Sequence, residues 1–323
     1  MSHNKVLAHK GHSMKLRITH ETLYHYTPTV ETAQHVAHLH PPITPCQSCQ
    51  HHQLSTEPEA TQVSSNIDAF GNHRLYWSLP SPHSTLKVTA KSELETFPIE
   101  DNRLNALKKQ MLHLPWENAV LAYRYRADIA SDEATEFAYA SHHAPIDMAF
   151  AIYAQSSFPP GRNLIEATRH LMQRIHADFK YESLSTDIST PALKVLENKK
   201  GVCQDFAHVM LACLRSLGLA ARYVSGYLLT EPPPGQPRLI GSDASHAWIS
   251  LRIPQINPVE GTESWYDFDP TNNRDGWCSP GIDYVRLAVG RDFADVSPLR
   301  GVLQGGTHHT LTVNVTVEPL NLS

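Results

Sequence analysis

The segment that ends at Leu217 constrains the fold of this chain more than any other. Its apolar residues follow the spacing i, i+3, i+4, i+7, i+8, i+11, which puts them on one face of an α-helix. These residues are Phe206, Val209, Met210, Cys213, Leu214 and Leu217. Gly218 follows directly and is the residue type that ends many helices. A helix with one continuous apolar face packs against a core, so we predict a buried helix that begins at Gly201–Cys203.

Helices precede this segment and strands follow it. A second amphipathic helix of about four turns is predicted from Leu164 to Phe179, and a shorter one over 191–197. Strand-like runs predict strands over 221–229, 246–253, 264–269 and 310–317. This order favours an α+β domain in which helices pack on one face of an antiparallel sheet.

The first part of the chain is typical of a small antiparallel β domain. Apolar and polar residues alternate from Met14 onward and again over 86–94. Asp68-Ala-Phe-Gly-Asn72 lies between two such runs, and we predict a hairpin connection in which Gly71 has a positive φ. Phe158-Pro-Pro-Gly161 marks a break in the chain. We therefore divide the chain into 1–13 (a disordered extension), 14–98 (the N-terminal β domain), 99–160 (a connecting region with short helices near 105–111 and 146–154), 161–296 (the α+β core) and 297–323 (a C-terminal strand segment).

The composition excludes several classes of protein. The 323 residues carry a formal net charge of −5 with neutral histidine, which argues against a nucleic-acid-binding protein because phosphate contacts require clustered lysine and arginine. No run approaches the ~18 consecutive apolar residues of a membrane span, and the first residues lack the apolar region of a secretory signal. We expect a cytoplasmic protein that binds neither nucleic acid nor membranes, and its oligomeric state stays open.

The five cysteines are scattered along a chain without a secretory signal, so we expect reduced thiols and no disulfide framework. Cys46-Gln-Ser-Cys49 with His51 and His52 is the one cluster in the sequence that resembles a zinc site. A second ligand pair at the usual spacing is missing, so we expect an unliganded loop and neither a metal nor a cofactor. A zinc-stabilised binding module remains the alternative for the N-terminal domain.

Cys203 is the candidate nucleophile. A thiol reacts as thiolate, and the start of a helix lowers the pKa of a thiol there through free N–H groups and a partial positive charge. The backbone N–H of Cys203 is also placed to donate to a developing oxyanion. Cysteine is often merely a buried residue, and Cys213 fits that interpretation because it lies mid-helix on the apolar face. Cys203 precedes that face and lies in a turn.

A thiol nucleophile needs a base and a group that orients it. Among 21 histidines, His246 is distinguished because it opens a predicted strand, on the face opposite its aliphatic residues. Asp267 and Asp269 share one face of another strand. Asp269 is preferred as the orienting acid because it ends that strand beside Pro270, and Asp267 is the reserve.

The segments that contain these residues resemble a known family. Gly201-Val-Cys-Gln-Asp-Phe-Ala-His208, Ser245-His-Ala-Trp248 and Asp267-Phe-Asp-Pro-Thr-Asn272 are similar to the three signature blocks of the transglutaminase-like superfamily. The best match is its bacterial branch, whose members are described as candidate cysteine proteases. Met14 to about Phe97 resembles the N-terminal β region of that branch, while 289–296 and 310–317 resemble its C-terminal segment.

This resemblance implies a papain-like α+β core, with helices packed on an antiparallel sheet, in which Cys203 is the nucleophile, His246 the base and Asp269 the orienting acid. The implied reaction is acyl transfer through a thioester on a peptide or protein substrate with an amide or glutamine acyl donor. Hydrolysis by a cysteine peptidase or amidase is expected, and protein-glutamine transamidation and a non-catalytic binding scaffold are the alternatives. The sequence has no D-x-[DN]-x-[DN]-G loop, so no calcium requirement is expected. Asp205 and His208 receive no catalytic role.

Overall fold

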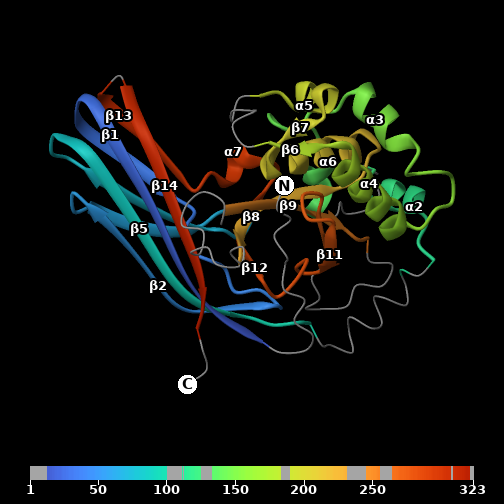
Figure 1. The fold of residues 1–323 in the computed structure, drawn as a ribbon, viewed down its shortest axis with the longest axis horizontal. Helices are drawn as coiled ribbons and strands as arrows, with labels where there is room; N and C mark the ends of the chain where they lie inside the picture. Colours follow the sequence, from blue (N-terminus) through green and yellow to red (C-terminus); the bar gives the residue numbers. More distant parts are fainter. Residues whose placement is uncertain are drawn as a thin grey trace.

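The computed structural model describes residues 13–99, 111, 113–124, 133–182, 190–230, 245–254, 264–306 and 308–320. Residues 1–12 of the expected extension over 1–13, and residues 105–110 of the expected helix over 105–111, lie outside these residues. Figure 1 shows the N-terminal strands at one end of the molecule and the helices at the other, with a second sheet between them.

The N-terminal strands form an antiparallel sheet of seven strands that also includes the last two described strands of the chain. Its order is β2-β5-β1-β4-β3, and two C-terminal strands pair with β1 as well. The strands are β1 (Met14–Ala37), β2 (Gln47–Glu57), β3 (Thr61–Ile67), β4 (His73–Leu79), β5 (His83–Thr96), β13 (Leu299–Gly305) and β14 (His308–Pro319). The expected C-terminal strand segment therefore joins the N-terminal sheet, as the red strands beside the blue strand β1 show (Figure 1).

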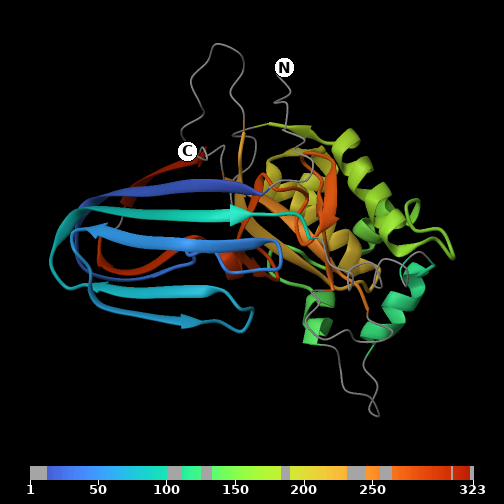
Figure 2. The ribbon, with the colours of Figure 1, turned by 90° about the horizontal axis from the view of Figure 1, so that it is seen from below.

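The long strand β1 organises this sheet. Its first half pairs with β5 and β14, while its second half pairs with β4 and β13. Alternate residues of the first half, including Leu16 and Ile18, are buried, as the period of two predicts. The connection from β3 to β4 is the predicted turn, in which Gly71 has a φ of +85°. Figure 2 shows these strands extending together away from the helices.

The second sheet is antiparallel and has the order β11-β10-β9-β8-β12. Its strands are β8 (Ala221–Leu228), β9 (Ser245–Arg252), β10 (Trp265–Asp269), β11 (Arg274–Trp277) and β12 (Tyr284–Gly290). The helices are α2 (Trp116–Tyr123), the 3-10 helix η1 (Glu133–Ala138), α3 (Met148–Gln155), α4 (Leu164–Asp178), α5 (Ala192–Asn198), α6 (Cys203–Ser216) and α7 (Phe293–Val296). Short strands β6 (Lys180–Tyr181) and β7 (Lys200–Gly201) pair in parallel. The α+β class and the predicted strands and helices within 161–296 are confirmed.

Helix α6 is more deeply buried than its sequence predicts. Every side chain from Asp205 to Arg215 is buried, because α6 lies between the second sheet and the helices α3, α4 and α5. Arg215 is 1% exposed, and its guanidinium donates to the carbonyl oxygens of Phe137 and Ala221 at 3.0 and 2.8 Å. A buried cation is tolerated when its donors are paired in this way.

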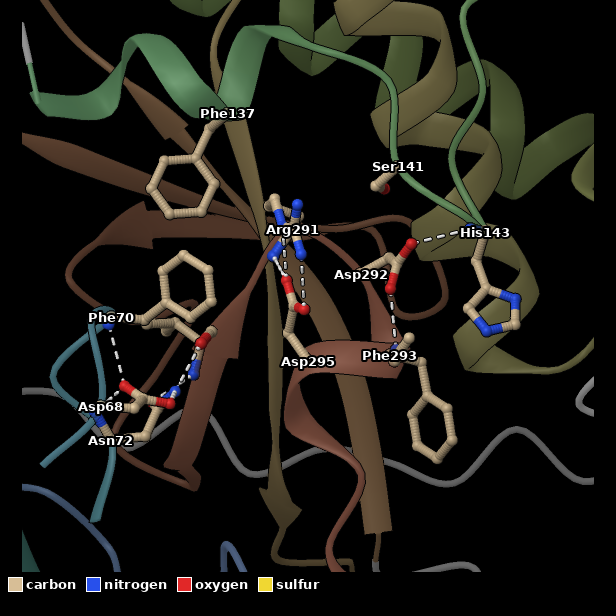
Figure 3. Close-up of polar contacts among 12 residues, drawn as sticks. Asp68, Phe70, Asn72, Phe137, Ser141, His143, Arg291, Asp292, Phe293 and Asp295 are labelled. Atoms are coloured by element: carbon tan, nitrogen blue, oxygen red, sulfur yellow. Dashed lines mark hydrogen bonds and ion pairs between the residues drawn. The ribbon is translucent and has the colours of Figure 1, made fainter. Parts of the chain in front are cut away.

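Two amide side chains join the N-terminal sheet to the edge strand β12. Asn72 donates to the Val289 carbonyl at 2.7 Å and accepts from the Val289 N–H at 2.8 Å. Gln47 makes the same pair of contacts with the backbone of Arg286, at 3.0 and 2.9 Å. Asp68 holds Asn72 in place by accepting from its backbone and side chain (Figure 3). Since each amide bonds as a neighbouring strand would, β12 has hydrogen-bond partners on its outer side.

The expectation of reduced cysteines is wrong for one pair. Cys46 and Cys278 form a disulfide between the two sheets, with their Cα atoms 6.4 Å apart. They are 232 residues apart in the sequence, so spacing could not reveal their proximity. Cys46 is therefore not available for the zinc pair with Cys49. Because disulfides persist mainly in oxidising compartments, this pair does not support the expected cytoplasmic location, which stays a prediction.

Within the described part of the chain, no helix has the length and apolarity needed to cross a membrane. The same residues contain no group of three or more His, Cys, Asp or Glu side chains that could hold a metal ion.

Candidate active site

Cys203 is the first residue of α6, as the sequence predicts. The residue before it, Val202, has extended backbone, and its N–H donates to the Asp205 carboxylate at 2.8 Å. A Cβ on Gly201 would lie only 2.6 Å from that carboxylate, so the glycine leaves room for the cap. Capping by Asp205 fixes the turn that presents Cys203, and the first N–H groups of the helix have no partner within it.

His246 is the second residue of β9 and so lies at the start of the strand. Its Nε2 lies 2.8 Å from Oδ2 of Asp269, the last residue of the neighbouring strand β10. The imidazole is 8% exposed and the carboxylate is fully buried. Antiparallel pairing of the two strands brings these residues together although 23 positions separate them in the sequence.

The Asp269 carboxylate accepts several further hydrogen bonds. Oδ2 accepts from the Tyr284 hydroxyl and from the Asn272 side chain, both at 2.7 Å. Oδ1 accepts from the Thr271 N–H at 2.9 Å. Burial alone would raise the pKa of Asp269, but His246, Tyr284 and Asn272 together lower it. Asp269 is therefore held as an anion that fixes the orientation of the imidazole.

The surroundings of His246 favour its protonated form. Burial alone would lower its pKa, but the hydrogen-bonded Asp269 carboxylate and, to a smaller extent, the sulfur of Cys203 raise it to about 10. The imidazole therefore carries a positive charge at neutral pH. Because Nε2 is used by Asp269, Nδ1 is the ring nitrogen left for Cys203.

Asp267, the reserve choice for the orienting acid, lies elsewhere in the structure. Its carboxylate accepts from the indole N–H of Trp248 at 2.8 Å and from the hydroxyl of Ser250 at 2.5 Å. Arg286 lies 3.8 Å from it. Asp267 thus fixes Trp248 and Ser250, the next side chains on the same face of β9, rather than His246 itself.

Cys203 and His246 line one pocket of about 300 Å³. Strand β8 forms one side with Tyr223, Ser225, Gly226 and Tyr227. The other lining residues are His20, Tyr181, Val202, Gln204, Ser245, Ala247, Leu287, Phe293 and Pro298. The structure therefore brings all three predicted residues to one site, with Asp269 behind His246.

Sequence reasoning missed three residues at this site. Asn272 lies within the third quoted block, three positions after Asp269, so its place could have been suspected. Tyr284 and His20 have no such signal, because they come from strands that only the tertiary structure brings to the site.

Asp205 and His208 support the site from within α6. His208 stacks on His143 with ring centroids 5.0 Å apart and accepts from the Phe293 N–H at 3.2 Å. Burial, with a smaller contribution from His143, lowers the pKa of His208 to about 3. Asp292 accepts from the His143 N–H at 2.7 Å (Figure 3). The neutral imidazole of His208 thereby connects α6 to α7, whose Phe293 lines the pocket.

Two family profiles match the chain. Residues 16–95 match the bacterial transglutaminase-like N-terminal region, and residues 153–270 match the transglutaminase-like superfamily. The second match contains Cys203, His246 and Asp269.

Individual proteins match over nearly the whole chain. An uncharacterized protein of Mycobacterium tuberculosis is 39% identical over 94% of this chain and 93% of its own length. A second uncharacterized protein, from Mycobacterium leprae, is 28% identical over 95% of this chain and 99% of its own length. The crystal structure of a candidate cysteine protease from Cytophaga hutchinsonii aligns with a TM-score of 0.70 at 20% identity and covers 97% of this chain and 93% of that protein. The structural match establishes a shared fold.

Proposed function

Because the chain belongs to the transglutaminase-like superfamily, we propose that it is a cysteine peptidase or amidase in which Cys203 is the nucleophile. The superfamily supports thiol-dependent acyl transfer on protein or peptide substrates in general. His246 serves as general acid and base, and Asp269 orients it. One observation carries the proposal: Cys203 begins a helix in the same pocket as an imidazole that is bonded to a buried carboxylate.

The first half of the reaction forms a thioester. The Cys203 thiolate attacks the carbonyl carbon of the amide, and the C=O electron pair moves to oxygen. The backbone N–H of Cys203 lies at the start of α6 and can donate to this oxyanion. His246 then gives its proton to the leaving amine as the C–N bond breaks.

The second half releases the acid. Neutral His246 takes a proton from water, the resulting hydroxide oxygen attacks the thioester carbonyl, and the C–S bond breaks to restore the thiolate. The pocket is partly open to solvent, so water can reach the thioester. This access supports hydrolysis over transfer to an amine.

The test is to incubate the protein with a library of glutamine-containing peptides, with and without a fluorescent amine. Ammonia release without label indicates an amidase, and backbone cleavage indicates a peptidase. Incorporation of the amine would show that the reaction is transamidation and not hydrolysis. Cys203→Ala should abolish the reaction, whereas Cys49→Ala, at a half-buried free cysteine of β2, should leave it intact. Activity that survives Cys203→Ala would overturn the proposal.

A further inference from the structure

We propose that the N-terminal β region builds one wall of the active-site pocket, and that His20 with Tyr227 limits the acyl groups that reach Cys203 to slender, uncharged ones. This inference deepens the function proposed above and rests on it for the role of Cys203. It also gives the N-terminal sheet a part in the reaction.

His20 is a fixed part of this wall. It lies in β1 opposite Val315 of β14 and Ala90 of β5, so strands hold its backbone on both sides. Its side chain is 2% exposed, yet it lines the pocket with Cys203. Burial lowers the pKa of His20 to about 4, so the wall is neutral at physiological pH.

Hydrogen bonds to both ring nitrogens lock the imidazole in place. Nδ1 lies 3.0 Å from the Tyr227 hydroxyl, and Nε2 lies 3.2 Å from Oγ1 of Thr22. Tyr227 belongs to β8 and directly follows Gly226, which pairs with His246. The His20–Tyr227 contact therefore connects the N-terminal sheet to the strand next to the imidazole of the site. A side chain held in this way cannot swing aside for a bulky substrate.

The amide hydrogen bonds from the N-terminal sheet to β12 keep the wall from moving as a unit. Leu287 lines the pocket and lies between Arg286 and Val289. These are the two residues whose backbone groups are bonded by Gln47 and Asn72 of the N-terminal sheet. The pocket of about 300 Å³ is at the lower end of the usual range for ligand sites. A fixed wall and a small volume together favour acyl groups of small cross-section.

The chemistry of the lining sets the charge preference. Among the described residues that line the pocket, none is Asp, Glu, Lys or Arg. Apart from the reacting pair of Cys203 and His246, the lining therefore offers no ion partner to a charged group next to the acyl carbonyl, which would lose its water there without compensation. An uncharged acyl group that can form a hydrogen bond with the Tyr227 hydroxyl fits better.

Alkylation of Cys203 tests the wall without requiring turnover. The second-order rate constants for iodoacetamide and for its bulkier N-phenyl derivative are measured at Cys203 by peptide mass spectrometry. Their ratio cancels changes in thiol reactivity. In His20→Ala the rate constant of the bulky reagent, divided by that of the small one, should rise roughly tenfold or more. This is the range of discrimination that a single methylene makes in a tight pocket. The matched control is His25→Ala, an exposed histidine of the same strand, which should leave the ratio unchanged.

Two variants separate wall volume from hydrogen bonding. His20→Phe keeps the volume of the ring and should retain a ratio close to that of the unsubstituted protein. Tyr227→Phe removes the hydroxyl that fixes His20 and should raise the ratio by less than His20→Ala does. If His20→Ala does not fold, His20→Val, which keeps a strand-forming residue, takes its place.

The two proposals can fail independently. An unchanged ratio in a folded His20→Ala or His20→Val protein overturns the wall, even if Cys203→Ala abolishes activity. Conversely, a raised ratio supports the wall even if no amide is hydrolysed, because alkylation reads only access to the thiol.

Discussion

Replacement of Asp269 by Asn tests the charge balance of the site most directly. The substitution keeps the size of the side chain and removes the negative charge that accepts from His246, Tyr284 and Asn272. The expected result is an imidazole that is neutral at pH 7 instead of charged.

The magnitude follows from the pKa of His246. Asp269 and Cys203 raise that pKa to about 10 against the opposing effect of burial, compared with an ordinary value of 6.5. At about 1.36 kcal/mol per pH unit, the difference corresponds to roughly 5 kcal/mol in favour of the protonated form. In Asp269→Asn the burial remains while the larger of the two raising contributions, that of the carboxylate, is lost, so the pKa should fall far below 10. We expect kcat to fall about 10²- to 10⁴-fold, because the imidazole loses both its charge and its orientation.

The sign of the pH dependence follows from the same raised pKa. The proton on His246 stabilises the folded protein fully below about pH 6.5, and this contribution is lost as the pH rises through about 10. The same proton is the one that His246 gives to the leaving amine. The alkaline limb of kcat/KM should therefore also lie near pH 10 in the unsubstituted protein. In Asp269→Asn it should move markedly towards acid.

The assay is an NMR titration of the His246 ring from pH 5 to 10.5, combined with the pH profile of kcat/KM. Asp267→Asn is the matched control, because Asp267 is equally buried and bonds Trp248 and Ser250 instead. A His246 ring that still titrates near pH 10 in Asp269→Asn, or an equally large pKa change in Asp267→Asn, would rule out Asp269 as the source of the raised pKa.

Three further outcomes are expected. Titration of the denatured, unreduced protein should count three free thiols, and a count of five would contradict the disulfide. Reduction of Cys46–Cys278 should lower the free energy of unfolding by about 2–5 kcal/mol. Asn72→Ala leaves two backbone groups of Val289 unpaired, so urea unfolding should show a loss of about 2–6 kcal/mol, whereas the exposed Asn66→Ala should change little. Activity should be unaffected by EDTA or added calcium, and a loss with EDTA would indicate an undetected metal.

The sequence predicted the local elements of the core well because each depends on neighbours in the chain. The helix that begins at Cys203 and ends by Gly218 follows from the spacing of its apolar residues and from its terminal glycine. Strand β9 and strand β10 follow in the same way from alternation. Helix α2 and the 3-10 helix η1 were missed, since the region from 99 to 160 has no strong periodicity.

Contacts between distant segments were beyond such reasoning. Cys46 and Cys278 were expected as free thiols because nothing in their spacing relates them. Arg215 was not recognised as buried, because its carbonyl partners Phe137 and Arg291 belong to η1 and to the connection after β12, far from it in the chain. Tyr284 was missed at the site for the same reason.

The sequence by itself determined which groups can react: a thiol at a helix start, an imidazole at a strand start and a carboxylate at a strand end. Periodicity and end signals act over a few residues, so these placements needed no tertiary information. Only the tertiary structure decided that Asp269 rather than Asp267 meets His246, that His20 of the N-terminal sheet faces the same pocket, and that amide side chains hold the two sheets together. These choices depend on strand register and on burial, which arise when segments far apart in the chain exclude water together.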